Sequence, residues 1–228
     1  MKNKYAYQSD MLGGERKTTV KIAINGLGRI GRAAFKIVEN VPSLELVAIN
    51  DLIEEDNLAY MLNYDSVYGR YEKEVQGQSG ALKVDGKSYK VLHEKDPTQL
   101  PWKDLDVDIV LECTGVFTNK ESLAKHIEAG AKHVILSAPI KGDGVDTIVH
   151  GVNKPSSDKT EIISCASCTT NCITPVFEIM GRRIGIKKAN MTTIHAYTTS
   201  QSIVDGPNKK WRRGRARAIN FVPTTTGA

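Results

Sequence analysis

The chain has 228 residues, a formal net charge of +5 at pH 7, 40% hydrophobic and 25% charged residues. This is the composition of an ordinary globular protein long enough to bury a substantial core. No apolar run approaches the length of a membrane span, which excludes an integral membrane protein of the helical kind.

Residues 1–19 are polar and aperiodic, and we interpret them as a flexible N-terminal arm without the apolar block of a secretory signal. The chain has four cysteines, three of them within residues 165–172. This spacing is not typical of a disulfide framework, and it favours catalytic or metal-binding cysteines in a reducing, cytoplasmic setting.

The predicted elements begin with a buried strand at 20–25, followed at once by glycines and a helix that starts near Arg29 and ends before Pro42. A second strand is expected at 45–50 and a short helix at 56–63. Asp85-Gly86, between LKV and KSYKVL, predicts a two-residue hairpin. A buried strand at 107–112, a helix near 121–129 and a strand at 133–137 follow. Strands that alternate with helices at this spacing predict parallel βαβ units in a doubly wound sheet.

The character of the chain changes near residue 165, where we place a domain boundary: residues 20–165 form a dinucleotide-binding domain and 166–228 begin a second one. A short strand (IIS) leads into a Ser/Thr/Asn cluster, an apolar segment through Met180 that could be helical, and a strand expected at 189–195. A sheet begun in about 60 residues would keep an unpaired edge and an uncovered face. We therefore expect the chain to be a fragment.

The sequence Gly26-Leu27-Gly28-Arg29-Ile30-Gly31 matches the G-x-G-x-x-G pattern of dinucleotide-binding turns, between a predicted strand and a predicted helix. The glycines permit the tight turn, the approach of a pyrophosphate and close packing of helix on strand, and the helix N-terminus favours the phosphates. Asp51 follows the second strand 20 residues beyond Gly31, where a carboxylate accepts hydrogen bonds from ribose hydroxyls and repels a 2′-phosphate. The pattern predicts NAD as cofactor in preference to NADP.

Cys168 stands where the apolar helix would begin, a position at which backbone N–H groups stabilise a thiolate. His195 is our candidate for the base that pairs with it. Taken singly, the cysteine would more often be buried and inert, and the histidine a satisfied core residue. Together, beside a dinucleotide-binding domain, they indicate a nucleophile and its base.

Two other interpretations are open. Cys165, Cys168 and Cys172 resemble the end of an iron–sulfur run, but the set is one cysteine short and Cys113 ends a predicted strand, so we expect no metal. The basic stretch 209–217 could contact nucleic acid, although only Trp211 is available there to stack on bases, and we do not expect nucleic acid as a primary partner.

Several segments of the chain occur in the order found in one enzyme family: INGLGRIGR, VAINDL, YDSVYG, LECTGVF, SAP, SCASCTTNC, HAYT, DGP and RRGRARAINFVPTTTGA. By these segments the chain resembles the phosphorylating glyceraldehyde-3-phosphate dehydrogenases over residues 20–228. The resemblance implies a Rossmann domain followed by an α+β catalytic domain with a mostly antiparallel sheet, incomplete in this chain, and a homotetramer. It implies oxidation of glyceraldehyde 3-phosphate with NAD and inorganic phosphate to 1,3-bisphosphoglycerate through a thioester on Cys168, with His195 as base.

The resemblance also implies site residues. The cofactor contacts would be Gly26, Gly28, Arg29, Ile30, Gly31, Asp51, Lys95 and Ser137. The two phosphate sites would use Ser167, Thr169, Thr198, Arg215, Thr226 and Gly227. A guanidinium such as that of Arg215 suits a phosphate because it binds two oxygens at fixed geometry. The Gly206-Pro207 pair is similar to the NAD-using, glycolytic branch.

The chain departs from the family in two respects. Cys165 stands where the family normally has asparagine, which places an extra thiol near Cys168. The family also continues for roughly 100 residues with further substrate and cofactor contacts, so we expect little activity from this chain alone. A paralogue acting on erythrose 4-phosphate is the alternative enzyme.

Overall fold

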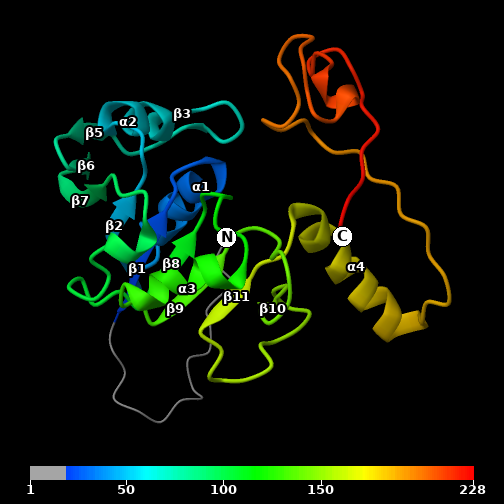
Figure 1. Ribbon diagram of the computed structural model, residues 1–228, viewed down its shortest axis with the longest axis horizontal. Helices are drawn as coiled ribbons and strands as arrows, with labels where there is room; N and C mark the ends of the chain where they lie inside the picture. The colour runs from blue at the N-terminus through cyan, green and yellow to red at the C-terminus, as the bar shows by residue number, and fades with distance from the viewer. Residues whose placement is uncertain (1–18) are drawn as a thin grey trace. The chain divides into compact units, whose positions relative to one another are not determined.

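A computed structural model describes residues 19–228, so the expected N-terminal arm lies outside the described residues except for Thr19. The described chain divides into two compact units. Figure 1 labels their helices and strands. The first comprises residues 19–117 and 121–135, and the second comprises residues 118–120 and 136–228. This division lies nearer the N-terminus than the boundary expected at residue 165, which stays a prediction.

The first unit alternates strands and helices as the sequence predicts. Its elements are β1 (Val20–Asn25), α1 (Arg29–Val38), β2 (Leu44–Asn50), α2 (Glu55–Asn63), β3 (Tyr64–Asp65), β4 (Gly69–Arg70), β5 (Val75–Gln78), β6 (Ala81–Val84), β7 (Lys87–Leu92), the 3₁₀ turn η1 (Pro97–Gln99), β8 (Ile109–Glu112), α3 (Lys120–Glu128) and β9 (His133–Leu136). Within this unit, the order of the sheet strands is β9-β8-β1-β2-β7-β6-β5.

The centre of this sheet is parallel, since β1 pairs in parallel with β2 and with β8, and β2 pairs in parallel with β7. Asn25 is in register with Asn50 on one side and with Glu112 on the other. The carboxyl ends of β1, β2 and β8 therefore meet at one edge, which is where open α/β sheets bind ligands. The prediction of a Rossmann-type, doubly wound domain is confirmed.

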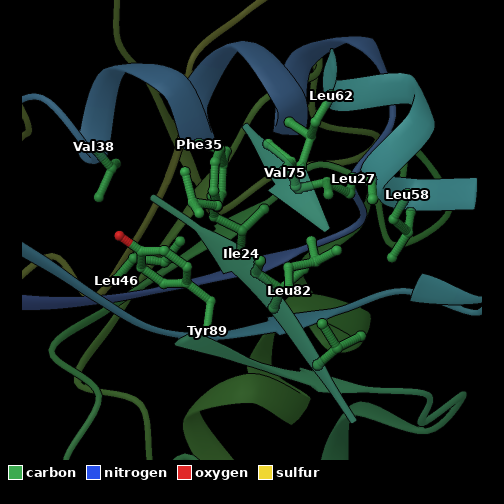
Figure 2. Packing of buried hydrophobic residues seen from close by; sticks show 14 of the residues in the cluster. Ile24, Leu27, Phe35, Val38, Leu46, Leu58, Leu62, Val75, Leu82 and Tyr89 are labelled. Carbon is green, nitrogen blue, oxygen red and sulfur yellow. The ribbon is translucent and has the colours of Figure 1, made fainter. Parts of the chain in front are cut away.

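Apolar side chains are buried on both faces of the sheet. On one face, α1 and α2 contribute Phe35, Val38, Leu58 and Leu62 to a cluster with Ile24, Leu46, Leu82 and Tyr89 (Figure 2). On the other, Trp102 and Val107 pack with Ala23, Ala48 and Val110. Small alanines on the second face let the 100–107 segment lie close to the strands, and this segment carries Trp102 into the interior, where it is fully buried.

The predicted hairpin is confirmed. Asp85 and Gly86 connect antiparallel β6 and β7 with positive φ values of 45° and 87°, the conformation that a two-residue turn of this kind requires.

The second unit contains β10 (Asp146–Thr147), which pairs in parallel with β11 (Ile162–Ser164), then α4 (Cys168–Ile184) and a 3₁₀ turn η2 (Trp211–Gly214). The helix expected after the cysteine cluster is thus present. The strand expected at 189–195 is wrong: these residues adopt no regular structure. β-Branched residues favour an extended chain, but a strand also needs a neighbouring strand for its N–H and C=O groups, and residues 189–195 belong to none of the sheets formed by residues 19–228.

None of the helices formed by residues 19–228 combines the length and the apolar character needed to cross a bilayer.

Candidate functional site

The glycine turn after β1 is shaped by close backbone packing. Gly26 has φ +91°, and a Cβ on it would lie 2.7 to 2.8 Å from atoms of Thr114. A Cβ on Gly31 would collide with the carbonyl oxygen of Gly26. Both positions therefore require glycine, and they bring the first turn of α1 directly onto the end of β1.

Gly28 differs from the other two glycines because, among residues 19–228, no neighbouring atom lies within 4 Å of the position its Cβ would take. It is the N-cap of α1, no side chain caps that helix, and the first turn has no acidic residue. Arg29 and Ile30 follow on the exposed surface, with Ile30 54% exposed. An open space bounded by a helix N-terminus suits a pyrophosphate, so the residues present fit a dinucleotide.

Asp51 lies at the same edge and takes part in the turn itself. Its Oδ2 accepts a hydrogen bond from the N–H of Leu27 at 2.6 Å, and its Oδ1 accepts from the N–H of Ile53 at 3.0 Å. The carboxylate thus ties the end of β2 to the glycine turn. Lys95 is exposed in the loop after β7, the strand that pairs with β2. Ser137 follows β9 and belongs to the second unit, where it is partly buried.

The candidate nucleophile stands at the first residue of α4. Ser167 caps this helix, since its Oγ accepts the N–H of Thr170 at 3.0 Å and lies 2.7 Å from that residue's Oγ1. Ala166, just before the cap, has φ +60°. The chain therefore enters the helix at a sharp angle and leaves the Cys168 side chain exposed.

The structure brings Cys168 and His195 together, although 26 residues separate them in sequence. The sulfur of Cys168 lies 3.2 Å from Nε2 of His195, and Nδ1 of that ring lies 2.6 Å from the carbonyl oxygen of Ala196. A carbonyl only accepts, so Nδ1 carries the proton in the neutral ring and Nε2 can accept the proton of the thiol. The hydrogen bond with His195, assisted by Thr169 and opposed by partial burial, lowers the pKa of Cys168 below its ordinary value. The pair can thus supply a thiolate nucleophile and a base.

A cavity of about 590 Å³ in the second unit lies beside this pair. Four of the residues expected from the sequence line it: Thr169, His195, Thr198 and Thr226. Thr198 Oγ1 lies 2.9 Å from Oγ of Ser200, and Thr226 Oγ1 accepts the N–H of Ala228 at 3.2 Å. Hydroxyl groups and one imidazole thus face a common space next to the thiol.

Two arginines that were not among the expected site residues also line this cavity. Arg213 donates to Oγ of Ser200 and, at 2.7 Å, to Oγ1 of Thr224. Arg217 stacks over the ring of Tyr197, with 5.2 Å from its guanidinium carbon to the ring centroid. The run of arginines in the sequence signals positive charge, but only the turn at 211–214 decides which of them face inward.

Three expected phosphate contacts do not line the cavity. Arg215 is exposed, and its Nη1 pairs with Oδ2 of Asp205 at 2.7 Å. Ser167 uses its hydroxyl as the helix cap, and Gly227 is exposed beyond the last lining residue. Their roles in phosphate binding stay predictions.

The other cysteines of the second unit have different surroundings. Burial raises the pKa of the Cys165 thiol, while the backbone of this residue donates to the carbonyl of Leu136 at 2.8 Å and accepts from Nδ2 of Asn171 at 2.6 Å. Cys172 is exposed one turn along α4 from Cys168. Within residues 19–228, no three His, Cys, Asp or Glu side chains gather in a way that could hold a metal ion.

Two family models match the chain. Residues 20–120 match the model described as "Glyceraldehyde 3-phosphate dehydrogenase, NAD binding domain", and residues 167–228 match "Glyceraldehyde 3-phosphate dehydrogenase, C-terminal domain".

Curated relatives with the same description are similar over nearly the whole chain. The glyceraldehyde-3-phosphate dehydrogenases of Clostridium pasteurianum and Clostridium acetobutylicum are each 51% identical to it over 211 residues, and that of Thermotoga maritima is 48% identical over 211 residues. These alignments cover 91% of the chain and 63% of each relative, so the chain spans a little under two thirds of their length.

Proposed function

The chain belongs to the glyceraldehyde-3-phosphate dehydrogenase family, and from that membership we propose that it carries the cofactor domain and the nucleophile of an NAD-dependent, phosphorylating aldehyde dehydrogenase. Its substrates are glyceraldehyde 3-phosphate and inorganic phosphate, and its product is 1,3-bisphosphoglycerate. The observation that carries the proposal is the 3.2 Å contact between the Cys168 sulfur and Nε2 of His195, at the start of a capped helix.

Cys168 is the nucleophile and His195 moves the protons. The thiolate adds to the aldehyde carbon, and the imidazolium stabilises the oxyanion that develops there. His195 then removes the hydroxyl proton of the resulting hemithioacetal as the acyl group becomes a thioester on Cys168. Phosphate cleaves this thioester, so the oxidation energy is retained in the acyl phosphate.

Most of the proposed cofactor contacts belong to the first unit. NAD, when bound, supplies the acceptor for the hydride that leaves the substrate carbon. Gly28 gives its pyrophosphate an open approach to the N-terminus of α1, and Arg29 and Ile30 flank that approach. Asp51 accepts hydrogen bonds from the ribose hydroxyls, and Lys95 and Ser137 make further contacts, as the family resemblance implies.

The phosphate groups bind in and around the cavity beside Cys168. Thr169, Thr198 and Thr226 line it, and Arg215 adds its guanidinium once a phosphate competes with Asp205 for it. Ser167 and Gly227 complete the two sites with hydroxyl and backbone donors. We also propose that residues 20–165 form the cofactor domain and that residues 166–228 begin the catalytic domain. The change in sequence character near residue 165 supports this division.

The proposal is tested by following the acyl group on the protein. The 228-residue chain is incubated with NAD and glyceraldehyde 3-phosphate without phosphate, and intact-protein and peptide mass spectrometry then locate any acyl adduct. We expect an adduct on Cys168 that added inorganic phosphate removes, with NADH released in proportion.

Cys172→Ser is the matched control, because it removes a thiol one turn along the same helix and should leave the adduct in place. Cys168→Ser should abolish it. An adduct that persists in Cys168→Ser, or one that phosphate does not discharge, would contradict the proposed chemistry.

The family resemblance supports a cytoplasmic homotetramer for the complete protein. Sedimentation of the complete protein is the measurement that checks the tetramer.

A further inference from the structure

A chain of buried polar side chains lies beneath the glycine turn in the first unit. Glu112, at the end of β8, and His126, on α3, are both 0% exposed, and Asn25 and Asn50 are nearly so. Buried polar groups cost free energy unless they are hydrogen-bonded. These residues form one connected network rather than isolated pairs, and the mechanism above uses none of them.

The hydrogen-bond donors around His126 determine which of its ring nitrogens carries the proton. Nε1 of Trp102 lies 3.0 Å from Nδ1 of His126, and an indole nitrogen only donates. Nδ1 is therefore the acceptor, and Nε2 carries the proton of the neutral ring. Nε2 lies 3.1 Å from Oε2 of Glu112, so the ring donates to the carboxylate. Trp102 thus selects the tautomer that supports Glu112.

Glu112 receives hydrogen bonds from every side. Oε2 accepts from Nδ2 of Asn25 at 2.5 Å as well as from His126. Oε1 accepts from the N–H of Thr114 at 2.8 Å and from its hydroxyl. Four donors thus converge on the two oxygens of this one side chain.

The network ends on the cofactor turn. Thr114, held by Glu112, lies against Gly26, where an added Cβ would be 2.7 Å from its nitrogen. Asn25 precedes that glycine, and its Oδ1 accepts from Nδ2 of Asn50 at 2.7 Å. The N–H of Gly26 in turn donates to the carbonyl of Asn50 at 2.7 Å. A displacement of Glu112 would therefore move both the residue before the turn and the wall beside it.

We propose that Glu112, supported by His126 and Trp102, is a positioning residue that holds the Gly26–Gly28 turn in the shape that receives the pyrophosphate of the dinucleotide. The inference rests on the proposed cofactor site. In this proposal Glu112 does not touch the cofactor. It raises the affinity for the cofactor indirectly, because it holds Thr114 and Asn25 in place. The network rigidifies the turn because each of its members is satisfied only in one arrangement.

The test compares dinucleotide affinity in variants that change one proton or one charge. In Glu112→Gln the side chain keeps its size but presents an NH₂ to groups that are all donors, so the NAD dissociation constant should rise at least about tenfold. In Trp102→Phe an aromatic ring remains at this position, but Nδ1 of His126 loses its hydrogen-bond donor. The NAD dissociation constant should then rise about fivefold. Binding is measured by NADH fluorescence and by calorimetry with NAD, using the whole chain.

Two control variants separate positioning from general stability. Glu39→Gln removes a poorly exposed carboxylate of the same unit, which pairs with Lys73 at 3.2 Å and does not belong to the network. Trp211→Phe makes the same exchange at an exposed site. Both should bind NAD with the constant of the unchanged chain at a temperature where circular dichroism shows every variant folded.

Two further measurements distinguish a positioning role from a general loss of stability. Loss of affinity in Glu112→Gln should be large for ADP-ribose, which carries the pyrophosphate, and small for adenosine, measured by competition with NADH. Nitrogen-15 NMR should show His126 as the Nε2–H tautomer in the unchanged chain.

The inference is overturned if the unchanged chain binds NAD and the folded variants bind it with the same dissociation constant. This comparison uses Glu112→Gln and Trp102→Phe, or whichever of the two folds. It is also overturned if His126 is found as the Nδ1–H tautomer. A chain that binds no NAD at all is a different result, because it removes the proposed cofactor site and this inference with it.

Discussion

Cys168 has the surroundings of a reactive thiol at the scale of a single residue. Its sulfur contacts Nε2 of His195, and its backbone lies in the first turn of α4, where the helix dipole favours negative charge. Cys165, three residues earlier, has the opposite character, since burial raises the pKa of its thiol. Sequence position alone does not separate two cysteines so close together, whereas exposure and the imidazole do.

This difference predicts the pH dependence of alkylation. Because His195 lowers the pKa of Cys168, a larger fraction is thiolate near neutral pH, and iodoacetamide should modify Cys168 with a rate midpoint below that of an ordinary thiol. His195→Gln should move the midpoint upward. Site-resolved peptide mass spectrometry at a series of pH values gives both curves, with Cys172 as the internal control. Coincident curves for Cys168 in the two proteins would refute the pairing.

The glycines of the cofactor turn should respond differently to the same substitution. Gly26→Ala forces a side chain into positive φ and against Thr114, and it should lower the free energy of unfolding by about 2 kcal/mol or more. Gly28→Ala meets no neighbour at φ −66°, so it should change stability by no more than about 0.5 kcal/mol, yet its methyl group enters the open space and should weaken NAD binding. Urea unfolding and NAD calorimetry check the pair. Unimpaired NAD binding by Gly28→Ala would place the pyrophosphate elsewhere.

At the scale of elements, His93 joins the end of β7 to the start of α2. Its Nδ1 lies 2.7 Å from the carbonyl oxygen of Asp51, and its Nε2 lies 3.1 Å from Oε1 of Glu55. The hydrogen bond with Glu55 raises the pKa of His93. The pKa of Glu55 is lowered by a backbone N–H and by His93. The two shifts make the junction sensitive to pH from both directions.

The sign of the effect follows from the two shifts. The contribution of His93 is fully present below the ordinary histidine pKa and is lost as pH rises through the raised value, while that of Glu55 is lost as pH falls through its lowered value. Their pair should therefore be most stabilising between about pH 4.5 and 6.5, the ordinary values of the two groups. The free energy of unfolding of His93→Gln should fall below that of the unchanged chain in this range, with the gap closing at higher pH. Urea titrations measure it, and His133→Gln, an exposed histidine on β9, is the control. The effect should be small and weaken with salt, since the imidazole is 39% exposed.

Elements with strong local signals were predictable, and those that depend on a partner were not. The hairpin at Asp85-Gly86 and the strand–glycine–helix unit at β1 and α1 follow from residues adjacent in sequence, because turn conformation and strand burial are local properties. The 189–195 segment has the composition of a strand but adopts no regular structure. Its identity as a strand would depend on a neighbour that its own residues do not specify.

At the scale of the whole molecule, the buried hydrophobic clusters belong to the first unit, whereas α4 in the second has no buried residue. Stability should be uneven as a result, because opening free energy follows apolar burial. We expect amide hydrogens of β1 and β8 to exchange by global unfolding and those of α4 to exchange at least about a hundredfold faster. Hydrogen exchange read by mass spectrometry tests this, and equal protection of α4 and β1 would contradict it. NAD should slow exchange at the glycine turn before it affects α4.

The amino-acid sequence by itself determined the class of the first domain and the glycine turn after its first strand, since each depends on short-range patterns, and it predicted the pairing of Cys168 with His195. Only the tertiary structure decided which donors reach a common space: Arg213 and Arg217 face the cavity while Arg215 pairs with Asp205, and Trp102 sets the proton of a buried histidine beneath Gly26. Contacts between residues far apart in sequence depend on how elements pack, and no local pattern encodes that packing.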